Sequence, residues 1–136
     1  MSASIKWVSL PVVLAIHDEL IVQFGGLPGS RDEGLLLSAL APPEQAAHYG
    51  FVDVPELAAI YAVAIAKNHA FVDGNKRTGF AVAATFLELN GFHPTLSEPE
   101  AVVLMLDIAT GQLDETGAGQ ILRVGCQALK RDRANF

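Results

Sequence analysis

The sequence predicts an all-α fold in a single domain that spans residues 1–136. Apolar residues recur at helical spacing along most of the chain, proline and glycine interrupt that spacing, and no segment shows a convincing strand pattern. With 136 residues, of which 51% are hydrophobic, the chain is long enough to bury a core. We therefore expect a compact bundle of about six helices around a central buried pair.

Charge and cysteine content narrow the classes of function. The formal net charge is −6 and no long basic run occurs, so nucleic acid is not an expected partner. Cys126 is the single cysteine, which rules out an internal disulfide and a cysteine zinc site and fits a reducing, cytoplasmic location. No apolar run is long enough to span a bilayer, so we expect no membrane partner.

The first part of the chain is expected to form two helices. Pro11 suits the first turn of a helix, and the apolar residues after it share one face until the glycine-rich residues 25–29 end it. A short second helix is expected over residues 31–41, because Pro42 and Pro43, which follow it, would stop it.

The central pair is expected over residues 55–68 and 74–89. The first of these segments is apolar on nearly all sides, which is typical of a helix in the centre of a core. Asn90 and Gly91 form a C-cap for the second segment.

Two more helices are expected in the rest of the chain. Ser97 with Glu100 forms a capping box, which opens one of them. The last is expected over roughly residues 117–131, where Lys130 and Arg131 would complement the negative end of the helix dipole.

The segment HAFVDGNKRTG at residues 69–79 joins the two central helices. Its second half opens a helix, where the first backbone N–H groups have no intrahelical partner and the helix dipole is positive. Lys76 and Arg77 are unfavourable at such an end unless an anion compensates them, and Gly74 lets the backbone approach a ligand closely. A phosphate group meets this demand.

Two neighbouring side chains can perform chemistry beside a phosphate. Asp73 can cap the helix or hold a divalent cation that bridges phosphates. His69 is expected to face the same cavity, where its imidazole can take a proton from a hydroxyl, and Phe71 is expected to anchor the loop in the core. From the residues alone, a surface turn with a helix-capping aspartate and solvated cations competes evenly with a phosphate-handling site.

The same segment resembles the signature of the Fic/Doc superfamily, which reads HxFx(D/E)GNGRxxR in its Fic branch. Lys76 replaces the second glycine of that pattern and gives the NKRT sequence of the Doc (death-on-curing) branch, and Phe80 replaces the second arginine. The resemblance extends over residues 17–40 and 56–92.

The resemblance implies an all-α fold and the toxin of a type II toxin–antitoxin system. Toxins of the Doc branch transfer the γ-phosphoryl group of ATP to a threonine of elongation factor Tu and halt translation, whereas Fic members transfer AMP. By position, His69 would be the base that acts on the target hydroxyl, Asp73 would hold Mg²⁺ and Phe71 would be structural. The residues that would bind the phosphates are Gly74, Asn75, Lys76 and Arg77.

The resemblance also implies a partner and leaves alternatives. Some Fic proteins carry an inhibitory [S/T]xxxE(G/N) motif in the same chain, and we find no match to it here. A Phd-type antitoxin that lays a helical segment in a groove is therefore implied.

His17 aligns with a histidine of the Doc branch and is a further candidate for the site. The alternatives are adenylyl transfer from the same pocket and a degenerate domain that only binds nucleotide or a partner protein.

Overall fold

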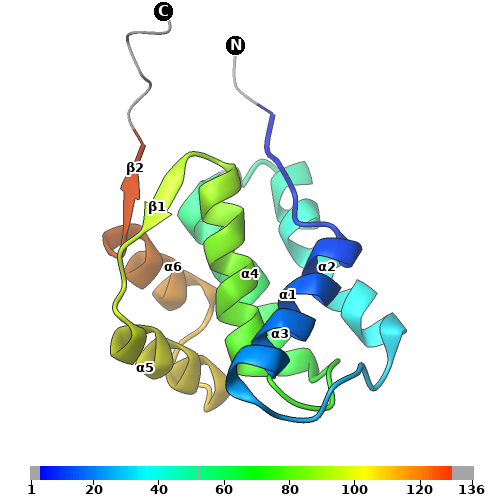
Figure 1. The fold of residues 1–136 in the computed structure, drawn as a ribbon. Coiled ribbons are helices and arrows are strands. Elements are labelled where there is room, and N and C mark those ends of the chain that lie inside the picture. Colours follow the sequence, from blue (N-terminus) through cyan, green and yellow to red (C-terminus); the bar gives the residue numbers. More distant parts are fainter. Residues whose placement is uncertain (1–3, 52, 130–136) are drawn as a thin grey trace, which may run out of the picture.

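The computed structural model describes residues 4–51 and 53–129 and has the predicted helical architecture (Figure 1). Within these residues no helix is both long and apolar enough to cross a membrane. The elements in chain order are α1 (Leu10–Phe24), α2 (Glu33–His48), α3 (Val54–Asn68), α4 (Asn75–Leu89), β1 (Phe92–Pro94), α5 (Glu98–Ala109), α6 (Glu115–Val124) and β2 (Cys126–Ala128).

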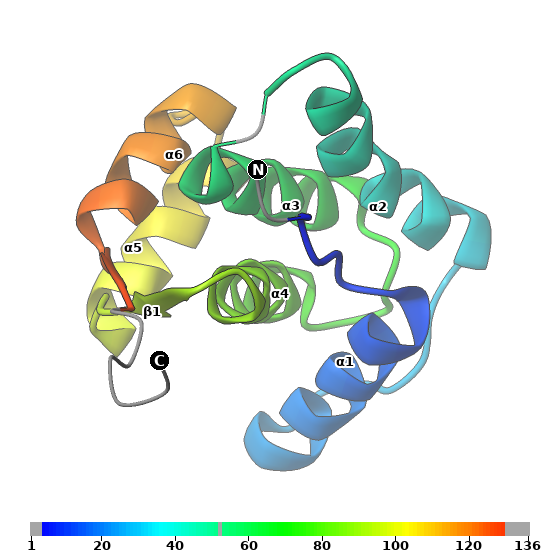
Figure 2. The same ribbon diagram turned by 90° about the horizontal axis from the view of Figure 1, so that it is seen from above.

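Helices α3 and α4 form the centre of the fold, as the sequence predicts. Seen from above they run side by side, with α1 and α2 along one side of the pair and α5 and α6 along the other (Figure 2). The two backbones approach closely at Gly79, where a Cβ atom would lie 3.1 Å from the carbonyl oxygen of Ala62. This distance is tighter than an ordinary contact, so a side chain at this position would push the two helices slightly apart near the start of α4.

The segment before α1 is fixed to the central pair by aromatic side chains. Trp7 stacks on Phe86 with ring centroids 5.6 Å apart, and the N–H of Val8 donates to the Tyr61 hydroxyl at 3.1 Å. Burial raises the pKa of Tyr61 from its ordinary value near 10 to about 12. These contacts attach the segment before α1 to the core and so position the first turn of α1.

Helix α2 continues beyond the position where we expected prolines to stop it. Pro42 and Pro43 both lie inside the helix, which ends at His48. A proline in a helix interior removes a hydrogen bond and costs about 3 kcal/mol. Here Pro43 is buried and Ala46 and Ala47 pack against the core. Burial of this last part of α2 against the core thus outweighs the local preference.

The last helix is shorter than predicted. Helix α6 ends at Val124 with Gly125 as its C-cap, and not near residue 131. A Cβ atom at Gly125 would lie 2.5 Å from a methyl group of Leu96, so a larger residue would clash there. A glycine that follows a helical segment is an ordinary stop signal, which the prediction overlooked. The basic end that we predicted, Lys130 and Arg131, lies outside the described residues.

Two strands of three residues contradict the expectation that the chain has none. Strands β1 and β2 pair antiparallel, with Phe92 opposite Ala128. Three residues are too few to show an alternating pattern, and the pairing joins segments that two helices separate in the sequence. Cys126 therefore lies in a strand and not in a helix, and its partial burial raises the pKa of its thiol, which favours the less reactive neutral form.

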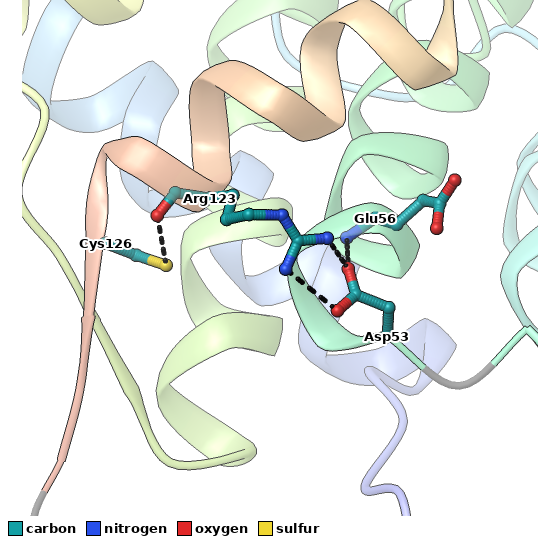
Figure 3. Close-up of polar contacts among 4 residues, drawn as sticks. All are labelled: Asp53, Glu56, Arg123 and Cys126. Carbon is teal, nitrogen blue, oxygen red and sulfur yellow. Dashed lines mark hydrogen bonds and ion pairs between the residues drawn. The ribbon is translucent and has the colours of Figure 1, made fainter.

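An ion pair ties α6 to the start of α3 (Figure 3). Asp53 is the N-cap of α3, and its Oδ2 accepts a hydrogen bond from the N–H of Glu56 at 3.1 Å. Arg123 of α6 donates to both oxygens of the same carboxylate, which raises the pKa of Arg123. Because Asp53 lies at the opposite end of α3 from residues 69–74, this cluster supports the fold and not the loop.

We predict that Asp53→Ala destabilises the protein more than Arg123→Ala does. Asp53→Ala removes a helix cap, which is worth about 1 kcal/mol, together with the ion pair. Arg123→Ala removes only the ion pair, whose exposed partners water and salt screen. Urea unfolding at low and high salt measures both losses. Equal losses in the two variants at high salt would show that the cap contributes nothing.

Candidate functional site

The loop predicted as a site reverses the chain between α3 and α4, at the lower edge of Figure 1. His69 is the C-cap of α3 and Gly74 is the N-cap of α4, and both have left-handed backbone angles, with φ of 50° and 80°. Among the described residues, His69 is the only one other than glycine with a positive φ. Histidine tolerates this conformation better than most residues do. The two left-handed residues let the chain reverse direction within a short loop.

The side chain of Asn75 holds the loop from inside. Its Oδ1 accepts from the N–H of Phe71 and its Nδ2 donates to the carbonyl of Phe71, both at 3.0 Å. Phe71 itself is buried, as expected of an anchor. These two bonds use Oδ1 and one of the two N–H groups of Nδ2. The backbone N–H of Asn75, which has no intrahelical partner at the start of α4, is a further donor for an anion.

A second loop, residues 25–31, lies against the first. The N–H of Arg31 donates to the carbonyl of Ala70 at 2.7 Å, and the N–H of Val72 donates to the carbonyl of Gly29 at 3.1 Å. We predicted this glycine-rich loop only as the end of a helix and missed that it supports residues 70–73 by hydrogen bonds. Its density of glycines was the available signal, because close backbone approach is a common reason for glycine.

The carboxylate of Asp73 does not cap α4. The N-cap is Gly74, and no side chain bonds to the first N–H groups of the helix. Instead the Asp73 carboxylate accepts from the N–H of Gly74 at 2.9 Å and from the N–H of Leu27 at 3.3 Å. Gly26 makes room for it, because a Cβ atom there would lie 2.8 Å from Oδ2 of Asp73. The helix-capping interpretation of Asp73 is therefore wrong.

Helix α1 contacts the same loop through His17. This histidine is buried, and its Nε2 lies 2.7 Å from the carbonyl oxygen of Asp73. Its ring stacks on Phe71 with centroids 3.8 Å apart. The structure thus places His17 against the predicted site, on the inner side of the loop.

A pocket of about 620 Å³ opens at the start of α4, between α1 and α5. Residues 73–77 form one polar end, and Ser97 and Glu98 are further polar residues in the lining. The apolar lining residues include Phe24, Phe80, Val102 and Leu106. Its size and mixed lining are typical of small-molecule sites.

The two predicted phosphate-binding cations lie at this polar end. Lys76 and Arg77 are both exposed. The guanidinium of Arg77 lies over the ring of Phe24, 4.3 Å from its centroid. Stacking uses the face of the guanidinium and leaves its N–H groups, which lie in the plane, able to bind an anion.

The structure brings the residues from Asp73 to Arg77 together, but it does not place His69 in the wall of the pocket. His69 is exposed at the start of the loop, and its carbonyl oxygen lies 3.5 Å from a guanidinium nitrogen of Arg31. No group of three or more histidine, cysteine, aspartate or glutamate side chains that could hold a metal ion occurs in residues 4–51 and 53–129. The catalytic and binding roles of these residues stay predictions.

Comparison with known proteins defines the class of the chain. The model of the Fic/DOC family matches residues 7–87. The chain is 34% identical over 119 residues to "Protein kinase doc" of Escherichia phage P1. This alignment covers 87% of this chain and 94% of the phage protein. The chain is also 44% identical over 98 residues to "Toxin Doc" of Mycolicibacterium smegmatis. That alignment covers 68% of this chain and 75% of the mycobacterial protein. The chain belongs to the Fic/DOC family, as its motif predicts.

We predict that Asn75→Ala loosens the loop. The change leaves the N–H and the carbonyl of Phe71 without partners, so the free energy of unfolding falls by about 1–3 kcal/mol. The Phe71 amide should also exchange its hydrogen faster than in the unchanged protein. Urea unfolding and amide hydrogen exchange measure the two effects. Asn68→Ala is the matched control, because Asn68 makes a single exposed bond to Leu35. Unchanged protection of the Phe71 amide in Asn75→Ala would refute this role.

Proposed function

We propose that the chain is the toxin of a type II toxin–antitoxin pair and an ATP-dependent protein kinase. In this proposal it transfers the γ-phosphoryl group to a threonine of elongation factor Tu, inhibits translation and acts in the cytoplasm. The observation that carries the proposal is the uncapped start of α4, where Lys76 and Arg77 line a pocket beside the carboxylate of Asp73. The names of the two relatives, a protein kinase and a toxin, support it.

The start of α4 is suited to the phosphates of ATP. Its first backbone N–H groups, from Asn75 onward, are not bonded by a capping side chain. Gly74 has no side chain to keep a ligand away from them. Lys76 and Arg77 add positive charge at the same place, and transfer of a phosphoryl group depends mainly on position and on neutralised charge.

Asp73 suits a magnesium ion that arrives with the nucleotide. Mg²⁺ is commonly held by one or two carboxylates together with substrate phosphates and water. The exposed Asp73 carboxylate lines the pocket next to the expected phosphate position, which fits this donor set. When bound, the ion would neutralise negative charge on the phosphates.

His69 suits the role of base for a protein acceptor. It is exposed at the start of the loop, outside the pocket wall, where a hydroxyl of another protein can approach it. In the proposed step His69 takes the hydroxyl proton and the threonine oxygen forms a bond to the γ-phosphorus. The bond from that phosphorus to the bridging oxygen breaks, and ADP leaves.

Two residues favour phosphoryl transfer over adenylyl transfer. Lys76 adds bulk and charge in the phosphate site where the Fic pattern has glycine, and Phe80 makes the neighbouring pocket wall apolar where that pattern has arginine. The nucleotide is therefore expected to sit differently from an adenylyl donor. The two related hypotheses, adenylyl transfer and a domain that only binds, become outcomes of the test below.

The apolar part of the pocket is the proposed groove for a helical segment of a Phd-type antitoxin. Phe24, Val102 and Leu106 line it and are 45%, 52% and 47% exposed, so they leave apolar surface in the pocket that a partner can cover. A helix with apolar anchors on one face would cover them, and an acidic residue at one end would meet Lys76 and Arg77.

We predict that the protein labels elongation factor Tu from γ-labelled ATP with Mg²⁺ and not from α-labelled ATP. His69→Ala should reduce this transfer by about 100-fold or more, because a positioned base contributes that much. His93→Ala is the matched control. His93 is an exposed histidine in β1, which follows the far end of α4.

Each other outcome of this assay has a definite meaning. Label from the α position would establish adenylyl transfer and overturn the kinase proposal. Full transfer by His69→Ala would exclude His69 as the base. No label from either position, on elongation factor Tu or on proteins of a whole lysate, would overturn the ATP-dependent kinase proposal and leave another nucleotide or the binding hypothesis.

We predict that Val102→Glu weakens binding of the antitoxin encoded beside the chain's own gene by about tenfold or more. A carboxylate in an apolar interface typically costs over 1 kcal/mol, and about 1.4 kcal/mol is tenfold in affinity. Val22→Glu makes the same change on α1 at a residue that is 83% exposed and outside the pocket, and should leave affinity unchanged. Isothermal titration calorimetry measures both. Equal affinities of the two variants would place the antitoxin elsewhere.

A further inference from the structure

A buried histidine in α1 lies directly behind the site. His17 is 1% exposed, and Thr78 is the only other buried polar or charged residue of the described chain. A buried polar group needs partners, so its bonds indicate its role. Its Nε2 lies 2.7 Å from the carbonyl oxygen of Asp73. Its Nδ1 lies 3.9 Å from the Asp18 carboxylate, which is too far for a hydrogen bond.

The chemistry of these atoms fixes the hydrogen on the ring. A carbonyl oxygen can only accept, so Nε2 must carry a hydrogen and donate it to Asp73. The face of the ring also stacks on Phe71, with the two planes 8° apart. His17 is therefore held in one orientation by contacts to both its edge and its face.

The bond to Asp73 sets the direction of a whole peptide group. In a trans peptide the C=O and the N–H point in opposite directions, and no cis peptide occurs among the described residues. Since His17 holds the carbonyl of Asp73, the N–H of Gly74 points the other way. There it donates to Oδ1 of Asp73 at 2.9 Å. His17 thus acts on the carboxylate through this peptide.

We propose that His17 is a positioning residue, which holds the Asp73 carboxylate in the direction that binds a divalent cation together with a nucleotide. This inference rests on the proposed function and deepens it. His17 lies outside the pocket wall and acts only through the peptide between Asp73 and Gly74. An ordinary core histidine would affect stability alone, so the two roles differ in what a substitution changes.

The test compares two substitutions of the histidine. In His17→Gln the amide nitrogen can donate near the position of Nε2, whereas His17→Leu fills similar space without a donor. We expect His17→Leu to weaken Mn²⁺ binding in the presence of ATP by about tenfold or more, as loss of a group that orients a metal ligand typically does. Electron paramagnetic resonance of free Mn²⁺ measures it. His17→Gln should retain most of the affinity for Mn²⁺. The Mg²⁺ concentration needed for transfer should rise more in His17→Leu than in His17→Gln.

Val13→Ala is the matched control for lost stability. Val13 is fully buried in α1, one turn before His17, and its side chain makes no hydrogen bond to the loop. We expect Val13→Ala to lower the unfolding temperature without a change in Mn²⁺ affinity. If Val13→Ala and His17→Leu weaken Mn²⁺ binding equally, or if His17→Gln binds no better than His17→Leu, the positioning role is wrong.

The unchanged protein provides a second test that needs no variant. A long-range ¹H–¹⁵N NMR spectrum should show the hydrogen of His17 on Nε2, and a neutral ring with its hydrogen on Nδ1 would overturn the inference. Failure of the proposed function is distinguishable from these outcomes. A protein that transfers no phosphoryl group but still separates His17→Leu from Val13→Ala in Mn²⁺ binding would retain the positioning role and lose the kinase.

Discussion

The close packing of α4 on α3 is the constraint on which the site depends. At Gly79 the two backbones come so near that a Cβ atom would lie 3.1 Å from the Ala62 carbonyl. Two consecutive helices held this close leave only residues 69–74 to reverse the chain. Such a short loop has no core of its own. Its turns therefore come from the left-handed residues His69 and Gly74. Its hydrogen bonds come from the side chains of Asn75 and His17 and from the backbone of residues 29–31.

The sequence predicts those parts of the fold that local signals specify. The apolar segment that became α3 and the capping box at Ser97 act within a few residues, and both were recognisable. The course of α2 through Pro42 and Pro43 and the pairing of β1 with β2 were not. Both depend on partners far along the chain, and their gain exceeds what the local sequence prefers.

The same division holds for the candidate site. Cations beside a helix start are a local feature, so the sequence predicts an anion-binding end at Lys76 and Arg77. The structure places both residues in the pocket wall, and their binding role stays a prediction. It did not show that Asn75 would use its amide on Phe71, or that the loop at residues 25–31 would contact Asp73. These facts follow from distances that only the folded chain defines. They restrict which donors are free for a ligand, and so they change the chemistry that can be proposed.

Helix α1 links the stability of the fold to the geometry of the site. Its two fully buried residues are Val13 and His17, and Leu10, Leu14 and Ile16 also pack against the core. The hydrogen bond from His17 to the carbonyl of Asp73 connects α1 to the loop at residues 69–74 and holds that peptide group in one direction. The same helix brings Phe24 under the guanidinium of Arg77 on the pocket side. A single helix thus supports the loop from behind and forms part of its open face, so displacement of α1 would disturb Asp73 and Arg77 together.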